Sequence, residues 1–411
     1  CVSRHDYHDP PGWGFMCATF TSYDCHDFMM QNCIAINSGD ADFMLYGEMW
    51  GGIWFEHKES TGLDNSARVM GSIFLDLGGW GSINDPKNSG VRQIENCIFW
   101  NNQGGYTGGR INGNPTVSLD HITIGQMWGS YGDKSYAWGT GASATSGFAS
   151  ASITNSNITG CNSYGVANLM TSNNNNFYGN AEDFGAQWGT PVPTAGDQDM
   201  FVDPQQQYIT RIEEGSPLKG AASDGGDIGA TVVNRYGVSG TLWGEPGFDE
   251  LLDEPLWPFP NEDAIKSTMG SWTYMNDGKR GFAADGNGLY GGPITLTSYI
   301  WEQLGNPCPP EVCNYDPTEI KAKTYPLPIS LSVHPNPFSA STKLTVGGSI
   351  SRHVFSVFDV KGALVKTIAF RGSSFIWDGR DQRGRLLPNG VYVCRYQSGR
   401  KIKQERISIM R

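Results

Sequence analysis

The sequence predicts an all-β protein in which short strands stack in repeated turns and a separate small β-sandwich follows. Three observations lead to this prediction. A short pattern of one polar residue, one small residue and alternating apolar positions recurs through the first 230 residues. The chain holds 54 glycines and 12% aromatic residues but only 17% charged residues, which suits tight turns and argues against disorder. The last 82 residues alternate apolar and polar positions in short runs.

The repeat has six clear copies, and most begin at a residue that suits a sharp corner. The copies start at Asn32, Gly71, Asn96, His121, Asn155 and Asn174, with spacings of 39, 25, 25, 34 and 19 residues. Asn and Gly tolerate the left-handed backbone that such corners need. One turn cannot bury its apolar side alone, so we expect successive turns to pair in parallel about 4.8 Å apart.

These copies resemble the right-handed parallel β-helix repeat of pectate-lyase-like and other polysaccharide-acting proteins. Residues 201–204 and 215–230 resemble the segment that closes such helices in secreted bacterial proteins. The resemblance covers residues 1–231, and it implies a right-handed parallel β-helix there.

The first five residues align with the copies that continue at Cys33 and Cys97. We therefore expect an N-terminally truncated β-helix, with earlier turns and a secretion signal in a longer product. A mature, lipid-modified terminus at Cys1 is the alternative. The register stacks Cys1, Cys33 and Cys97 in one column, either as buried thiols or with a Cys1–Cys33 bridge. Cys308 and Cys313 either close a short disulfide loop or are free thiols.

Residues 232–313 are rich in Pro and Trp and lack the repeat. Two short helices are expected there, one capped by Asn261 and one capped by Thr297. We interpret the segment as a capping lid or brace over the end of the β-helix, with a separate functional domain as the alternative. Residues 314–329 have the composition of a stiff linker.

Residues 330–411 carry three motifs in a fixed order. They are His-Pro-Asn-Pro-Phe at 334–338, a Lys-Gly hairpin within 358–365, and a block with Trp-Asp-Gly and Asn-Gly-Val-Tyr within 377–392. Together they resemble the C-terminal sorting domain of type IX secretion cargo, which shares its fold with the FlgD-like Ig module. The resemblance implies an Ig-like sandwich that contacts the secretion machinery and directs export, followed by release or surface attachment. An ordinary Ig-like spacer is the alternative.

Charge and hydropathy argue against two classes of partner, nucleic acids and membranes. The net charge is −12, and no run of Lys or Arg occurs in the first 300 residues, so we expect no nucleic-acid partner. No apolar stretch reaches the roughly 18 to 20 residues of a membrane span. With the sorting-domain resemblance, these features predict a secreted, extracellular protein at the cell surface.

Polysaccharide lyases on the β-helix fold use a base and often Ca²⁺ held by carboxylates, whereas glycoside hydrolases use paired carboxylates. The candidate catalytic groups are His26, Asp27, Glu56, His57 and Lys58. The candidate Ca²⁺ ligands are Asp6, Asp9, Asp40 and Asp42. Corner chemistry and ordinary surface exposure are the alternative explanation for all of these residues.

The longer insertions also carry aromatic side chains, whose flat faces suit stacking on sugars. The candidates are Trp50, Trp54, Trp80, Tyr106, Trp128 and Trp138. The leading hypothesis is therefore a protein that binds, and in one interpretation cleaves, an acidic or complex polysaccharide. A non-enzymatic adhesin or structural stalk is one alternative, and a defined polysaccharide lyase or glycoside hydrolase is the other. Fold alone does not separate them.

Overall fold

The computed structural model describes residues 1–4, 20–23, 27–36, 52–56, 66–77, 82–87, 90–108, 116–127, 139–144, 150–186, 189–272, 278–305, 307–313, 330–347, 353–370, 374–398 and 401–411. They form two compact units, residues 1–317 and 318–411. The division falls within the segment whose composition predicts a linker.

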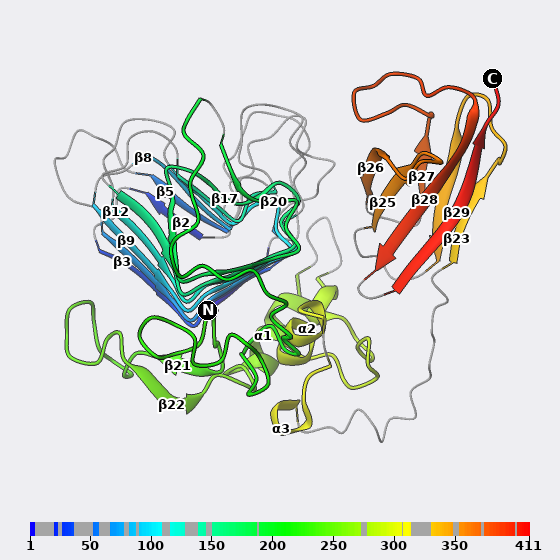
Figure 1. The fold of residues 1–411 in the computed structure, drawn as a ribbon. Helices are drawn as coiled ribbons and strands as arrows, with labels where there is room; N and C mark the ends of the chain where they lie inside the picture. The colour runs from blue at the N-terminus through cyan, green and yellow to red at the C-terminus, as the bar shows by residue number, and fades with distance from the viewer. Residues whose placement is uncertain are drawn as a thin grey trace. The chain divides into compact units, whose positions relative to one another are not determined.

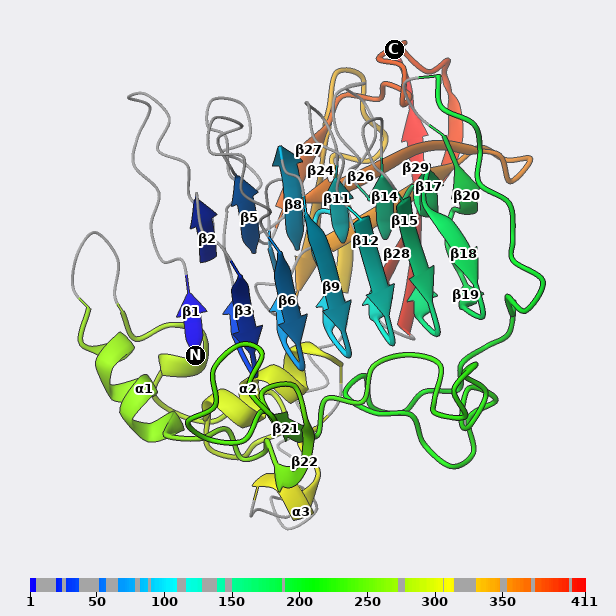
Figure 2. The ribbon, with the colours of Figure 1, turned by 90° about the vertical axis from the view of Figure 1, so that its left-hand side faces the viewer.

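The first unit is built on a parallel β-helix with three sheets, and each turn adds one strand to sheets A, B and C in that order. Sheet A contains β1 (Val2–Arg4), β4 (Ile34–Ile36), β7 (Ile73–Leu75), β10 (Ile98–Trp100), β13 (Thr123–Gly125), β16 (Asn157–Thr159) and β19 (Asn176–Tyr178). Sheet B contains β2 (Phe20–Tyr23), β5 (Ile53–Glu56), β8 (Ile83–Lys87), β11 (Tyr106–Gly108), β14 (Ala142–Ala144), β17 (Tyr164–Asn168) and β20 (Glu182–Gly185). Sheet C contains β3 (Phe28–Gln31), β6 (Ala67–Met70), β9 (Val91–Glu95), β12 (Thr116–Asp120), β15 (Ser150–Thr154) and β18 (Thr171–Asn173). Figure 2 shows the strands of sheets B and C side by side in chain order, and the strands of all three sheets pair in parallel, so the predicted parallel stacking is confirmed.

The register also matches the sequence repeat. All six predicted start positions have positive φ, from 49° at Asn96 to 59° at Asn174, and all lie at the corner between sheets C and A. Residues that follow each corner pair in parallel, as Ile98 does with Ile73 and Thr123. The left-handed backbone at these corners explains the preference for Asn and Gly.

The interior of the β-helix is a stack of apolar side chains. Phe74 and Phe99 pack edge to face, with ring centroids 5.3 Å apart. The predicted cysteine column forms as well, and Cys33 and Cys97 are buried free thiols. Burial raises the pKa of the Cys97 thiol to about 12, so this side chain packs as a small apolar group.

The outer face of sheet A is covered by the chain that follows the β-helix. Outward-facing Ile34, Ile73 and Ile98 share one core with residues of the later segment, including Trp257 and Trp301. Figure 1 shows α1 (Glu262–Gly270) and α2 (Leu296–Gln303) on this side, whereas the hairpin of β21 (Asn234–Tyr236) and β22 (Leu251–Pro255) lies below the corner between sheets C and A. The segment therefore packs along a flank of the β-helix and not over its end, because the apolar surface that it buries belongs to sheet A.

The two expected helices form, but their caps differ from expectation. The N-cap of α2 is Thr295, which exchanges hydrogen bonds with Ser298 in a capping box, and Thr297 lies inside the helix. Asn261 precedes α1 with a φ of 59° and makes no side-chain capping bond. A 3₁₀ turn, η3 (Gly281–Ala283), and a short helix, α3 (Pro310–Cys313), complete this segment. Cys308 and Cys313 form a disulfide.

Residues 221–236, called the strap below, run back along the corners between sheets C and A. The Asn96 side chain accepts a hydrogen bond from the backbone N–H of Thr231 and donates one to its carbonyl. Asn32 holds the N–H and carbonyl of Tyr236 in the same way, each at 2.8 Å. Thus the corner amides connect the β-helix to its covering segment.

The second unit contains two antiparallel sheets. One holds β23 (Ser330–His334), β24 (Thr342–Gly347) and β27 (Ser374–Trp377), and the other holds β25 (His353–Phe358), β26 (Leu364–Phe370), β28 (Gly390–Ser398) and β29 (Lys401–Ile409). Leu344 and Trp377 from the first sheet share one core with Phe355 from the second. Asn336, in the Pro-Asn-Pro-Phe motif, accepts a hydrogen bond from Ser408 N–H. The Ig-like relationship and the sorting role stay predictions.

Candidate functional site

The outer face of sheet C differs from that of sheet A because it carries polar side chains. In β9 the residues alternate, with Val91 and Gln93 exposed and Arg92 and Ile94 buried. One row across the sheet is Arg68, Gln93, Ser118, Ser152 and Thr171, and a second is Val91, Thr116 and Ser150. Parallel pairing repeats these side chains about every 4.8 Å.

The hydroxyls of this face are held by neighbouring strands. Thr171 donates to the carbonyl of Ala151 at 3.0 Å, and Ser152 donates to the carbonyl of Val117 at 3.4 Å. A hydroxyl that donates to the backbone still has lone pairs that accept from a ligand. The face is therefore an ordered array of acceptors on a rigid sheet, which favours repeated polar contacts with an extended ligand.

Charged residues line the corner between this face and sheet A. Arg68 forms an ion pair with Asp249 of the covering segment, and its guanidinium lies 3.9 Å from the carboxylate of Glu95. Burial raises the pKa of Glu95, and the positive charge of Arg68 opposes this rise only in part. The single described arginine on the outer face of sheet C is thus already paired with carboxylates.

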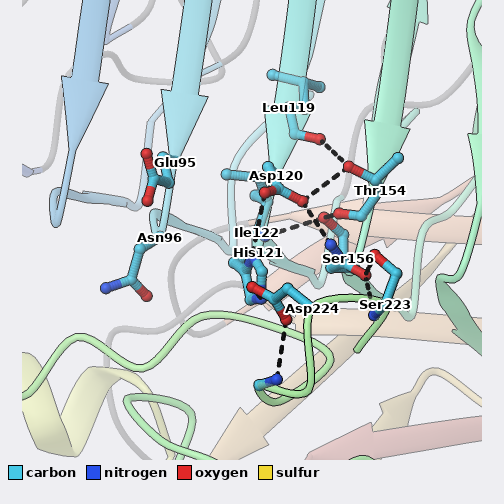
Figure 3. A network of polar contacts seen from close by, with 12 residues as sticks. Glu95, Asn96, Leu119, Asp120, His121, Ile122, Thr154, Ser156, Ser223 and Asp224 are labelled. Carbon is cyan, nitrogen blue, oxygen red and sulfur yellow. Dashed lines mark hydrogen bonds and ion pairs between the residues drawn. The ribbon is translucent and has the colours of Figure 1, made fainter. Parts of the chain in front are cut away.

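His121 occupies the next corner, between two carboxylates (Figure 3). Its Nδ1 lies 3.2 Å from Asp120 Oδ2, and its Nε2 lies 3.6 Å from Asp224 Oδ2 in the strap. Burial by itself would lower the pKa of His121, but the hydrogen bond that its ring donates to Asp120 and the nearby negative charges raise it overall. The imidazole therefore favours its protonated form more than a free histidine does.

Asp120 completes this network by accepting hydrogen bonds from two side chains of the next turn. The Thr154 hydroxyl donates to it at 2.7 Å, and the Asn155 amide donates at 2.9 Å. Burial would raise the pKa of Asp120, yet the hydrogen bonds from His121, Thr154 and Asn155 lower it overall. Asp120 is therefore held as a carboxylate and is poorly suited to act as a general acid.

Aromatic side chains of the later part of the chain lie beside Arg68. The Phe248 ring is stacked under the Arg68 guanidinium, 5.3 Å from its centroid. Trp243 packs against Phe248 with ring centroids 5.8 Å apart. Half-buried Trp243 and exposed Leu242 thus give the charged corner an apolar border.

Four of the candidates named from sequence fall within the described residues. Tyr106 lies in the inward row of sheet B and is fully buried, so its ring packs in the core and offers no face to a sugar. Trp54 and Glu56 lie on β5, where Trp54 pairs with Thr21 and Asn84. Asp27 is an exposed corner residue with a φ of 49°, which fits the turn explanation.

The remaining candidates lie outside the described residues, and their roles stay predictions. They are His26, His57 and Lys58, the tryptophans Trp50, Trp80, Trp128 and Trp138, and the aspartates Asp6, Asp9, Asp40 and Asp42. The described residues contain no group of three His, Cys, Asp or Glu side chains arranged to hold a metal ion. The expected Ca²⁺ site is therefore untested.

The sequence repeat predicts a corner at His121 but does not predict the charged network that surrounds this residue. The adjacent Asp120-His121 pair at the end of a repeat was a visible signal. Asp224 and Asp249 were not predictable as partners, because they reach the corner from the later, covering part of the chain.

Comparisons with known proteins give few matches. No protein-family model matches the chain, and no curated protein matches it. Part of the chain is similar to the structure of PorZ, a surface component of the type IX secretion system of Porphyromonas gingivalis, with 19% identity, a TM-score of 0.20, and coverage of 22% of this chain and 13% of that one. Another part-match is dimeric latent PorU from the same bacterium, with 19% identity, a TM-score of 0.17, and coverage of 19% and 9%. The chain thus matches well under a fifth of the length of either protein.

Within the part of the chain that the structure describes, no helix is long and apolar enough to cross a membrane.

Proposed function

We propose that this protein is a secreted, surface-displayed β-helix protein that binds an extended polysaccharide on the outer face of sheet C. The observation that carries the proposal is the contrast between two faces. The outer face of sheet A is apolar in its early turns and is buried under the covering segment. The outer face of sheet C presents rows of Ser, Thr and Gln at the strand spacing, and Phe248, on which Trp243 packs, stacks on Arg68 in one of these rows. Repeated polar groups beside an aromatic ring suit a chain of sugars.

Charge selects among polysaccharides. The described groups at the corner of sheet C comprise four carboxylates, Glu95, Asp120, Asp224 and Asp249, against Arg68 and His121. Among the described residues of this face, a uronate-rich chain would meet net negative charge and no unpaired arginine. The ligand we propose is therefore a neutral polysaccharide, which replaces the acidic one favoured by fold resemblance.

The proposal that the protein is secreted is supported by different observations. The Cys308–Cys313 disulfide is typical of oxidising compartments. The motifs of residues 330–411 favour a sorting and anchoring role for the second unit. In a bacterium with type IX secretion, the full gene product should reach the cell surface or medium, and a version lacking residues 330–411 should be retained in the cell. Equal export of both versions would contradict the sorting role.

The binding test compares two double variants of the full chain by affinity electrophoresis in neutral glucan, neutral mannan, pectate and alginate gels. Gln93→Ala with Ser118→Ala removes hydrogen-bonding groups from the centre of the proposed face. Gln207→Ala with Ser239→Ala is the matched control, because both residues are exposed and lie outside the strands of sheets A, B and C. We expect the first pair to weaken retention by a neutral glycan about tenfold, as two lost hydrogen bonds would, and the control pair to leave it unchanged.

The same experiment separates the alternatives. Retention with the release of reducing ends or unsaturated products would identify a hydrolase or a lyase. No retention in any gel would favour the stalk and contradict the proposal. Equal weakening by both variant pairs would place binding elsewhere on the molecule.

A further inference from the structure

The strap is held along the corners by a ladder of side chains, one turn after another. Asn174 donates to the carbonyl of Ala221 at 3.1 Å, and Asn155 accepts from the N–H of Ser223 at 2.9 Å. Further along, Asn96 binds Thr231 and Asn32 binds Tyr236. These amide contacts do not titrate, so their strength is the same across the physiological pH range.

His121 breaks this ladder, because it is the one titratable residue among the six corners. In place of an amide pairing with the backbone, its ring holds the Asp224 carboxylate of the strap at 3.6 Å. The Asp224 carboxylate also accepts a hydrogen bond from the N–H of Gly226 at 2.8 Å, which shapes the loop at this point. The contact between His121 and the strap is therefore an ion pair whose existence depends on one proton.

The charged groups that face His121 come from three elements. Asp120 ends the preceding strand, Asp224 belongs to the strap, and Glu95 lies one turn away on β9. Arg68 and Asp249 lie beyond Glu95 and are paired with each other. The immediate neighbours of the imidazole are thus negative. When His121 loses its proton, Asp120 and Asp224 face each other without an intervening positive charge.

We propose that His121 is a pH-sensitive latch, whose imidazolium bridges Asp120 and Asp224 and whose deprotonation releases Asp224 and loosens the strap over residues 222–228, which Asn155 still holds at Ser223. The raised pKa of His121 sets the direction in which the strap contact responds to pH. A group with a raised folded-state pKa contributes stability that is fully present below its ordinary pKa of about 6.5 and is lost as pH rises through the folded value. The latch is closed in mildly acidic medium and open in alkaline medium.

The test follows hydrogen exchange by mass spectrometry on the full chain between pH 5.5 and 9, with rates corrected for the intrinsic pH dependence of exchange. Protection of residues 222–228 should fall on the order of two- to fivefold across this range, as loss of one partly exposed ion pair would produce. Residues 230–237 are the internal control, because Asn96 and Asn32 hold them through amides, and their protection should stay constant. Exchange of the imidazole C2 hydrogen reports the protonation of His121 in the same samples.

Two variants test whether the ion pair between His121 and Asp224 causes the pH dependence of protection. His121→Asn gives this corner the residue found at four of the others and should make protection of residues 222–228 independent of pH. Asp224→Asn keeps the histidine but removes the strap charge, and it should abolish the gain in protection at low pH. Constant protection in the unmodified protein while His121 titrates would overturn the proposal. An unchanged pH response in His121→Asn would overturn it as well.

Discussion

The residue at each corner between sheets C and A decides how the strap is held. Four of the six corners use Asn, whose side chain can both donate and accept. Asn32 and Asn96 do both with the strap backbone, whereas Asn155 only accepts from it and Asn174 only donates to it. Gly71 is an exception, because the ring of Tyr236 occupies the space that a side chain would fill. A Cβ at position 71 would approach that ring to 2.7 Å. Glycine is therefore required there for packing as well as for its φ of 54°.

We therefore expect Gly71→Ala to lower the free energy of unfolding more than Gly179→Ala does. Both glycines have positive φ, but nothing lies within 4 Å of a Cβ at Gly179. Gly179→Ala should cost about 1 kcal/mol from the backbone alone. Gly71→Ala should cost about 3 kcal/mol, because displacement of Tyr236 adds an overpacking penalty. Urea unfolding measures the loss of unfolding free energy in each variant. Equal losses would show that the Tyr236 ring moves aside without an energetic penalty.

Residue types alone revealed the corners but not every inward position. Alternation along β9 is readable from sequence, yet Arg92 occupies an inward position between Ala67 and Val117 and is fully buried. A simple apolar-in, polar-out assignment places arginine outside. The partner of His121 was equally hidden, since Asp224 follows it by about a hundred residues and reaches the corner only when the strap folds back.

At the scale of elements, local sequence signals located the helices but not their first residues. Thr295 and Thr297 are two residues apart, and both are acceptable caps by residue type. Ser298 decides between them, because its hydroxyl accepts a hydrogen bond from the backbone N–H of Thr295 while its own N–H donates to the Thr295 hydroxyl. Thr297 instead uses its hydroxyl to accept a hydrogen bond from Phe259 N–H, a tertiary contact that single-sequence reasoning does not supply.

The cap gives a prediction for α2. Thr295→Ala should raise the hydrogen-exchange rate of residues 296–303 about fivefold, which corresponds to the roughly 1 kcal/mol of a lost capping bond. Thr295→Ser retains the hydroxyl and should leave the rate nearly unchanged. If both variants exchange equally fast, the methyl group of Thr295, and not its hydroxyl, stabilises the helix start.

For the whole molecule, the parallel stacking of the strands up to Gly185 was predictable, because the spacing of the corner residues in the sequence sets the register of each turn. The position of the covering segment was not predictable from the repeat alone. The outer row of sheet A changes from Ile34, Ile73 and Ile98 to Thr123 and Asn157, and this change marks where the apolar cover gives way to polar contacts. This change from apolar to polar residues is visible in the sequence. It shows that the flank at sheet A is covered only after the structure has assigned which positions face outward.

The two units have separate cores, which predicts two unfolding transitions in calorimetry of the full chain. Phe99→Ala should lower only the transition of the β-helix unit, by several degrees, because it leaves a cavity beside Phe74. Trp377→Ala should lower only the transition of the second unit, whose core it helps to form. A shift of both transitions by either variant would indicate that the units unfold together.

The ladder of corner contacts also limits how this β-helix can change its length. A solenoid can ordinarily gain or lose a repeat with little penalty, since each repeat contacts only its neighbours. Here the strap touches turn after turn at fixed sites, from Asn174 at one end to Asn32 at the other. Removing a single turn would leave the contacts beyond it out of register, so the length of the strap fixes the number of turns between Asn32 and Asn174.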